Sequence, residues 1–343
     1  MSHPTGPRLV LGLIIGVVAV QALMLFAFAW PASNSGPREV PIAIAGPPQA
    51  VGQIEQALGS VPSREAGVPA FDVVQVEDEA AATQAIADRD VYGAVVVGPG
   101  GPQLLVASAA SPAVAQMLRS AAAELSPTDG GLAVQDVVPT AGDDPTGAGL
   151  TAGVLPLILT SAGGGLAISL LLSRRGVRFV AVTGLAVAAG LGSAALLKYG
   201  LEVVDGSYWE LAGIVALVVG AVAAAVAGLG AVFGRAGAGL GLAVMILLGN
   251  PFSAAASAPE FLPQPWGEWG QLLPPGAGIT AVRSVAFFDG AALGRPLVVL
   301  ATWLVAGLAL VLLGRTGRGT VDSAETGNVP DRGTSETRSS AGA

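Results

Sequence analysis

Long apolar runs separated by short polar segments make up most of the chain. The first run covers 9–29, and five more follow at about 150–172, 179–198, 211–233, 240–258 and 296–314. Each is close to the roughly 20 residues that an α-helix needs to cross the hydrocarbon core of a bilayer. The pattern predicts an α-helical polytopic membrane protein with six spans, the fifth of which is broken at Pro251.

The first run has two interpretations. Ala27-Phe28-Ala29, ahead of Trp30, has the form of a signal-peptidase site. Its apolar core is, however, longer than the roughly 7–15 residues of a secretory signal. We therefore expect 1–30 to remain attached as a cytoplasmic end and span 1, with cleavage as the alternative.

Between the first two runs lies 31–149, the one long segment without a membrane-length run. Short stretches rich in β-branched residues predict strands at 40–46, 71–77, 92–98, 104–108 and 132–138. The stretches between them predict helices at 48–59, 78–90 and 112–125. The third helix starts with Ser111 as N-cap and Pro112 at the first helical position. This order predicts an α/β domain inserted between spans 1 and 2.

The other five runs form a membrane domain, 150–314, that is rich in Gly and Ala. Gly230 and Gly234, and again Gly237 and Gly241, have the GxxxG spacing that lets two helices approach closely. We expect these glycines to serve helix packing inside one chain rather than a specific dimer contact. The tail, 315–343, is rich in Ser, Thr and Gly and is predicted to be disordered.

The charges in the loops predict the direction in which the spans cross the membrane. Arginines follow the second, fourth and sixth runs: Arg174, Arg175, Arg178, Arg235, Arg315 and Arg318. The loop 199–210 carries three acidic residues and neither Lys nor Arg. Because cytoplasmic loops are enriched in Lys and Arg, both termini are predicted to be cytoplasmic, and the α/β domain to lie outside the plasma membrane.

An unusual segment, 249–290, separates the last two runs. It begins with Asn250 and Pro251 and later contains Pro274, Pro275 and Gly276. Proline lacks the N–H that a helix interior needs, and a broken helix is tolerated at membrane depth only where its backbone is buried in protein or lines a wet cavity. We expect a half-helix, a break and an interfacial helix at about 277–288, which together form a re-entrant segment.

Arg283 lies in that last helix, and two roles are open for it. In the first, its guanidinium reaches to the lipid headgroups, as long cationic side chains do at membrane surfaces. In the second, it pairs with Glu260 or Glu268 and holds the segment closed over a pathway. The candidate gate residues are therefore Asn250, Pro251, Pro274, Pro275, Gly276 and Arg283.

The half-span that ends in Gly and Pro, then Leu272-Leu273-Pro274-Pro275-Gly276, then Arg283 and Phe287-Phe288 before a final span, resembles the end of an ABC exporter permease. The layout of one span, a large outer domain and five further spans is similar to the YhgE/Pip-like (phage infection protein) group. The resemblance implies a membrane subunit without its own ATPase, powered by a separate cytoplasmic ATPase. It also implies a second permease chain, identical or different, in the complex. Arg174, Arg175 and Arg178 are the candidate loop for contacting the ATPase.

The composition disfavours several classes of functional site and partner. The chain is 52% hydrophobic and 12% charged, with no cysteine and one histidine, His3. Disulfides, thiolate metal sites and Ser-His-Asp triads are therefore excluded or nearly so, and we expect no enzyme, cofactor or metal site. Segment 31–149 holds 14 acidic and 4 basic residues, which disfavours nucleic acid as a partner.

Two acidic groups in 31–149 need no catalytic role. Glu77-Asp78-Glu79 fits the N-cap and acidic first turn of the predicted helix at 78–90 better than a metal or acid/base cluster. Asp143-Asp144 lies in a linker rich in Gly, Pro and Thr, where we expect both carboxylates to be solvated.

The sequence lacks two features that would allow the chain to power transport by itself. No Asp, Glu, Lys, Arg or His lies near the centre of a predicted span, although proton- and ion-driven carriers use such residues. The chain also lacks the GxxxxGK[ST] phosphate loop. If the protein moves a substrate, another polypeptide supplies the energy. The loops 173–178 and 234–239 are short for docking an ATPase, so the alternative is a scaffold or receptor that displays the α/β domain and transports nothing.

Overall fold

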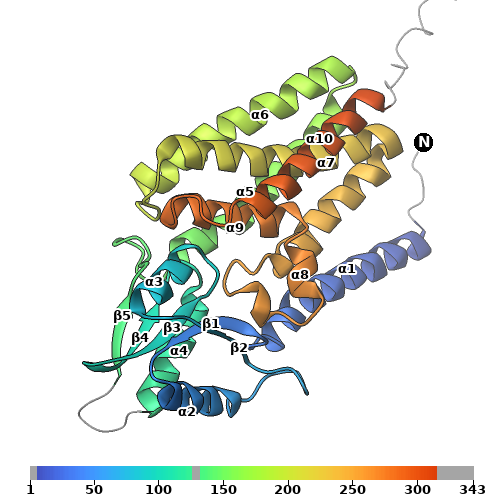
Figure 1. Cartoon of the computed structure of the whole chain (residues 1–343). Helices are drawn as coiled ribbons and strands as arrows, with labels where there is room; N and C mark the ends of the chain where they lie inside the picture. The colour runs from blue at the N-terminus through green and yellow to red at the C-terminus, as the bar shows by residue number, and fades with distance from the viewer. Residues whose placement is uncertain (1–5, 126–131, 315–343) are drawn as a thin grey trace, which may run out of the picture.

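The computed structural model describes residues 6–125 and 132–314; the predicted disordered tail lies outside them. A helical bundle occupies one end of the molecule and an α/β region the other (Figure 1). In the described part of the chain, five helices are long and apolar enough to cross a membrane, as expected of a polytopic membrane protein. They are α1 (Pro7–Ser33), α5 (Ala148–Leu171), α6 (Arg175–Ala195), α7 (Tyr208–Ala243) and α10 (Gly294–Leu313).

Two of these helices end in wider π-helical turns. α6 continues into η1 (Leu196–Gly200), and α7 continues into η2 (Val244–Gly249). π-turns are rare and often occur at functional sites. Both turns lie at the helix ends that lead into the segments connecting to the next helix.

Helix α7 contains the fourth predicted run and the first residues of the fifth, and it reverses direction between them. Gly234 has φ 67° and ψ −149°, which no helical residue adopts. Beyond it the chain packs back on itself: a Cβ added to Gly241 would lie 3.0 Å from Cα of Val226, and one added to Gly230 would lie 3.0 Å from Cβ of Ala238. The glycines with GxxxG spacing therefore join two arms of one helical hairpin, as predicted for packing inside one chain.

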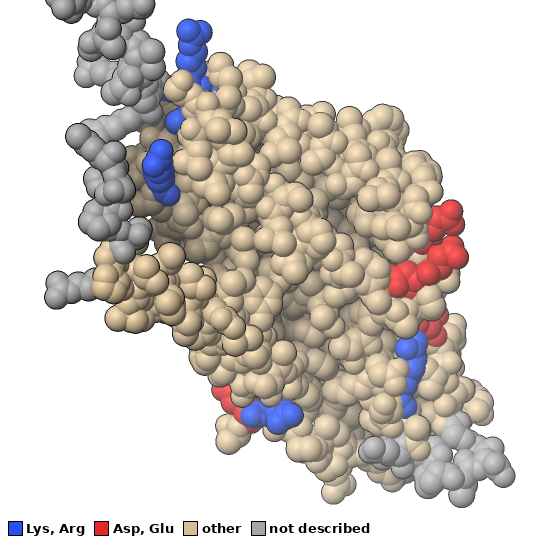
Figure 2. Space-filling view, turned by 180° about the vertical axis from the view of Figure 1, so that it is seen from behind, with Lys and Arg blue, Asp and Glu red and all other residues tan. Residues whose placement is uncertain are grey.

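The first arm of α7 forms the centre of the bundle. Every residue from Val218 to Gly228 is buried, and α5, α6 and α10 pack around this arm. Helix α1, by contrast, leaves the bundle at an angle (Figure 1), and every residue from Leu9 to Phe26 is exposed. On the face shown in Figure 2, a broad uncharged surface separates charged side chains near the two ends of the molecule. Such a surface is suited to lipid.

The α/β region contains one five-stranded sheet in the order β2-β1-β3-β4-β5. Its strands are β1 (Val40–Ala45), β2 (Phe71–Gln75), β3 (Gly93–Gly98), β4 (Gly101–Val106) and β5 (Ala133–Asp136). β1 runs parallel to β2 and β3, β4 runs antiparallel to β3, and β5 runs parallel to β4. All five predicted strands are present, although β4 begins earlier than expected because Gly101, at φ 104°, pairs with Gly98 across a two-residue turn.

Three helices cover the two faces of the sheet: α2 (Pro48–Gly59) and α4 (Pro112–Leu125) on one face, and α3 (Glu79–Ala87) on the other. The carboxylate of Asp78 accepts the Ala81 N–H at 2.9 Å, so the predicted N-cap is present. Asp144, expected to be solvated, is instead buried and accepts the N–H groups of Gly149 and Leu150 at 2.9 and 3.2 Å. Its carboxylate satisfies the first turn of α5, which would otherwise have unpaired donors.

The cores of the α/β region include residues from the segment between α7 and α10. Ala258 and Phe261 belong to the apolar cluster between the sheet and helices α2 and α4. Phe288 belongs to the cluster on the α3 face. The α/β fold is thus built from 31–149 together with residues more than a hundred positions later in the sequence.

The hairpin in α7 gives the first testable prediction. A side chain at Gly237 would collide with the backbone carbonyl of Leu229 on the opposite arm, whereas Gly239, two residues later, has open space around it. Gly237→Leu should destabilise the chain by about 1–3 kcal/mol or more, since overpacking forces the backbone apart. Gly239→Leu is the matched control and should behave like the wild type.

The measurement is the membrane abundance of each variant and its thermal unfolding after purification in mild detergent. Equal unfolding temperatures for the two variants would show that the arms are not packed in this way.

Candidate functional site

The segment between α7 and α10 follows a broken path. After η2 come two 3-10 turns and two helices, η3 (Pro251–Ser253), η4 (Pro259–Phe261), α8 (Trp266–Gly270) and α9 (Pro274–Phe287). The predicted break at Pro251 is confirmed, because regular helix stops before it and Ala254 takes a left-handed φ of 58°. Asn250 contributes its carbonyl, which accepts the Ser253 N–H at 3.2 Å and the Ser253 hydroxyl at 2.7 Å.

The predicted prolines and glycine pack the start of α9 against the end of η2. Pro274 and Pro275 occupy the first helical positions, where a missing N–H costs nothing. A Cβ added to Gly249 would lie 2.6 Å from Cγ of Pro275, and one added to Gly276 would overlap the carbonyl of Gly270. The five predicted residues Asn250, Pro251, Pro274, Pro275 and Gly276 are thus brought to one tightly packed corner.

The helix expected at the membrane interface is instead buried. In α9 only Thr280 and Phe287 are even partly exposed, and the helix packs against α5, α7 and α10. An interfacial helix needs a continuous polar face, whereas α9 is apolar or small on most sides. Gly278 illustrates this fit, since a Cβ there would lie 2.9 Å from Cγ2 of Val218.

Arg283 neither reaches the lipid-exposed surface nor pairs with either predicted glutamate, and its role as a gate stays a prediction. Its side chain is 6% exposed, and Nη2 donates to the carbonyl of Ala255 at 2.7 Å. The Thr151 hydroxyl of α5 donates to the same oxygen at 3.1 Å. The ion pairs among the described residues are Arg38–Glu65 and Arg119–Asp136, so Arg283 pairs with neither Glu260 nor Glu268. Arg283 instead holds the backbone just beyond the break.

The α/β region holds the same helix from the other side. Arg89, in the turn after α3, donates from Nη1 to the Thr280 carbonyl at 2.9 Å and to the Ser284 hydroxyl at 2.6 Å. Its guanidinium also lies 5.0 Å from the centre of the Phe288 ring, a cation–π distance. Two successive turns of α9 are therefore fixed to the turn after α3.

Two further contacts connect the α/β region to the loop before α8. The Tyr92 hydroxyl donates to Oε2 of Glu260 at 2.9 Å. Arg38, which is buried, donates from Nη1 to the Phe261 carbonyl at 2.9 Å. We call Arg89, Tyr92, Glu260 and Arg283 the junction cluster. The sequence marks Arg89 only as one of four basic residues in an acidic segment, and it gives no signal for the pairing of Tyr92 with Glu260.

The protonation of the cluster follows from its burial. Burial raises the pKa of the Glu260 carboxyl above its ordinary value, against the lowering by its hydrogen bonds and by Arg89. Burial, reinforced by the neighbouring Glu260 carboxylate, raises the pKa of the Tyr92 hydroxyl well above its ordinary value. Tyr92 therefore remains protonated and donates to Glu260.

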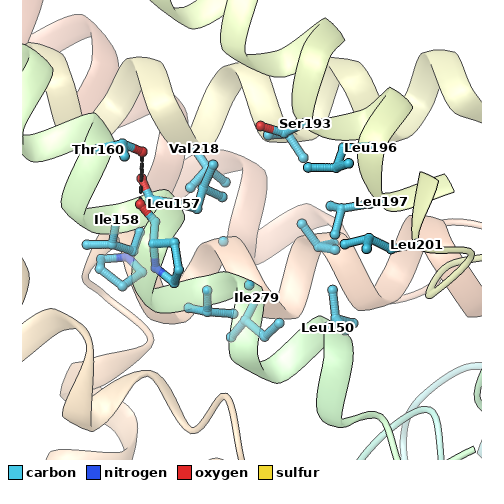
Figure 3. A pocket seen from close by; sticks show the side chains of 17 residues that line it. Leu150, Leu157, Ile158, Thr160, Ser193, Leu196, Leu197, Leu201, Val218 and Ile279 are labelled. Carbon is cyan, nitrogen blue, oxygen red and sulfur yellow. Dashed lines mark hydrogen bonds between the residues drawn. The ribbon is translucent and has the colours of Figure 1, made fainter. Parts of the chain in front are cut away.

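On its opposite face α9 lines a cavity of about 250 Å³, which we call the bundle cavity. Figure 3 shows apolar side chains from α5, the end of α6, α7 and α9 around this space. The α9 contribution is Pro275, Gly278, Ile279 and Val282. The Thr160 hydroxyl, the polar group of the α5 wall, is already bonded to the carbonyls of Pro156 and Leu157 at 2.8 and 3.2 Å.

Only some of the arginines in the predicted ATPase-contacting loop are available to contact a partner. Arg178 is 7% exposed and donates to the Leu172 and Ser169 carbonyls at 2.6 and 3.0 Å, which caps the end of α5. Arg175 donates to the carbonyl of Leu312 at 3.1 Å, at the end of α10, while remaining exposed. Arg178 is thus unsuited to docking, and Arg174, which is exposed, is the better placed member of the loop.

Glu260 gives a prediction about pH. A carboxyl whose pKa is raised by folding contributes stability that is complete below its unfolded pKa and is lost as pH rises through the folded pKa. Glu260→Gln keeps an acceptor for Tyr92 and carries no charge. Its unfolding temperature should therefore exceed that of the wild type at about pH 8 by more than it does at about pH 5.

Thermal unfolding of the purified full chain at the two pH values measures this difference. Glu268→Gln, at an exposed position in α8, is the matched control and should change nothing. A Glu260→Gln variant less stable than the wild type at both pH values would show that the carboxylate is needed to balance the two arginines.

Comparisons with known proteins give no further information about the function of this chain. No family model, no curated protein and no solved structure matches the chain. What the protein does therefore has to be inferred from its residues and their contacts.

Proposed function

We propose that this chain is the membrane-spanning subunit of an ABC-type exporter, powered by a separate cytoplasmic ATPase chain. The observation that supports this proposal best is the position of α9. One face of this helix lines the bundle cavity, and the other is held by Arg89 of the α/β region and by the backbone beyond Pro251. An apolar cavity in a helical bundle, with one wall coupled to an extramembrane region, suits a transporter.

The coupling is direct because the two sets of residues alternate along one helix. Ile279 and Val282 line the cavity, while Thr280 and Ser284 accept hydrogen bonds from Arg89. A displacement of the α/β region therefore carries the cavity wall with it. The absence of charged residues near the centres of the apolar helices fits an external source of energy, since coupling ions need such residues.

The proposed topology has six spans. The two arms of the α7 hairpin count as separate crossings, although the second arm is short and ends in the break. In Figure 1 the start of α1 and the end of α10 lie on the side away from the sheet. The arginines between α5 and α6 lie at that side too, so it is assigned to the cytoplasm of a plasma-membrane protein. A second permease chain in the complex follows from the family resemblance.

A non-transporting scaffold or receptor is the second candidate, and one observation favours it. Two of the three arginines in the candidate docking loop are bonded to the ends of α5 and α10. Among the described residues on that side, Arg174 and Arg235, in the α7 reversal, are exposed, and Arg175 is exposed but bonded to Leu312. In a scaffold, the junction cluster would only fix the displayed α/β region to the membrane.

Purification of the tagged full chain from native membranes in mild detergent separates the two candidates. Mass spectrometry should find a co-purifying chain with a GxxxxGK[ST] phosphate loop. The double variant Arg174→Glu and Arg235→Glu should lower its recovery by about tenfold or more, since it replaces attraction with repulsion across the contact.

Arg64→Glu is the control, because Arg64 is exposed in the α/β region at the other end of the molecule. It should leave the recovery of the ATPase unchanged. Recovery of other chains without any ATPase, from wild type and variants alike, would contradict the exporter and favour the scaffold.

A further inference from the structure

The bundle cavity opens sideways, between α5 and the end of α6. Leu196 and Leu201 line it and are nevertheless 57% and 51% exposed. On the neighbouring helix α5, Pro156 and Thr160 line the cavity and are exposed as well. Apart from Thr160, the rim of the opening is therefore apolar, on helices that are long and apolar enough to lie in a membrane.

Two local departures from regular helix and one glycine leave room for the cavity. Pro156 interrupts the hydrogen bonding of α5 on the cavity wall. At the other wall the turn is widened, and the Leu201 N–H donates to the Leu196 carbonyl at 2.8 Å. Gly153 lacks a side chain at the position that faces Leu197, where an added Cβ would lie 3.9 Å from Cδ2. A proline, a π-turn and a glycine on facing elements all keep the cavity from being filled by the protein.

The side chains that line the bundle cavity determine which molecules can bind in it. Water needs two to four polar partners in a buried site, and the Thr160 hydroxyl on this wall already bonds to backbone carbonyls. An engineered cavity of about 150 Å³ lined by Leu, Ile and Phe in another protein stays dry and takes up hydrocarbon. The bundle cavity, at about 250 Å³, is larger, and its lining is apolar except for the hydroxyl groups of Thr160 and Ser193. In a bilayer its opening faces hydrocarbon chains.

We propose that the bundle cavity binds one acyl chain of a membrane phospholipid, which enters sideways between α5 and α6. The chain would lie against Ile279 and Val282 of α9. This inference deepens the proposed function, on which it rests for the claim that the bound lipid is cargo; binding itself requires only the cavity.

The buried face of α9 makes the proposal testable. Ile279 and Val282 are 4% and 5% exposed, so bulk lipid does not reach them except through the cavity. The full chain is reconstituted in phosphatidylcholine vesicles that contain a phosphatidylcholine with a diazirine at the end of one acyl chain. After illumination, mass spectrometry of peptides should find adducts on Ile279 or Val282.

Gly153→Leu fills the cavity from the α5 side and should lower these adducts by about tenfold or more, because it excludes several buried methylene groups. Gly163→Leu places the same side chain on the same helix at a site with open space around it, and should leave the adducts unchanged. Ile279→Ala enlarges the cavity and should keep or increase labelling of Val282. If Gly153→Leu does not fold, the labelling of α9 in the wild type and in Ile279→Ala still tests the proposal.

Adducts confined to exposed positions such as Leu155, with none on α9 of the wild type, overturn the proposal. So does α9 labelling that persists unchanged in folded Gly153→Leu. In a parallel arm with a diazirine fatty acid, labelling of α9 by the fatty acid but not by the phospholipid would overturn the assignment to phospholipid. Since these results do not depend on an ATPase, the lipid site and the exporter can fail separately.

Discussion

The carbonyl oxygen of Ala255 sets the main constraint on this structure. A helix broken at Pro251 leaves backbone acceptors without helical partners, and an unsatisfied group away from water costs several kcal/mol. Here Arg283 and Thr151 both donate to that oxygen. The break is therefore stabilised by side chains from α5 and α9. Pro251 and Arg283, which are far apart in the sequence, serve one structural purpose.

The position of α9 follows from that contact. To reach Ala255, the helix has to enter the bundle, and its small residues allow it to pack there against α7. Once α9 is buried, the polar groups on its far side need partners as well. Arg89 supplies them for Thr280 and Ser284. The α/β region is thus bound to the membrane helices through hydrogen bonds and through a shared apolar core that includes Phe261 and Phe288.

The sequence predicts the parts of this arrangement that depend on local patterns. The apolar runs, the five strands, the Asp78 cap and the break at Pro251 each follow from periodicity, propensity or the chemistry of one residue. The partners of Arg283 and Arg178 do not, because both guanidiniums bind backbone carbonyls, and every residue has one. The burial of Asp144 does not follow from local pattern either, since a linker composition does not reveal that the carboxylate caps the next helix.

The same contacts indicate which wall of the bundle cavity is rigid. At the start of α9, Pro275 lies against Gly249, and no Cβ could be inserted there without a collision. Further along, Arg283 and Arg89 fix the helix from two sides. The opposite wall, at the end of α6, is a π-turn whose Leu196 and Leu201 are half exposed. Displacing that wall breaks the hydrogen bonds of Lys198 to the carbonyls of Asp205 and Gly206 but none of those in the junction cluster, whereas displacing α9 alone breaks the hydrogen bonds that stabilise the helix break. Lateral access through α6 is therefore compatible with an intact junction cluster, and access by movement of α9 requires the α/β region to move with it.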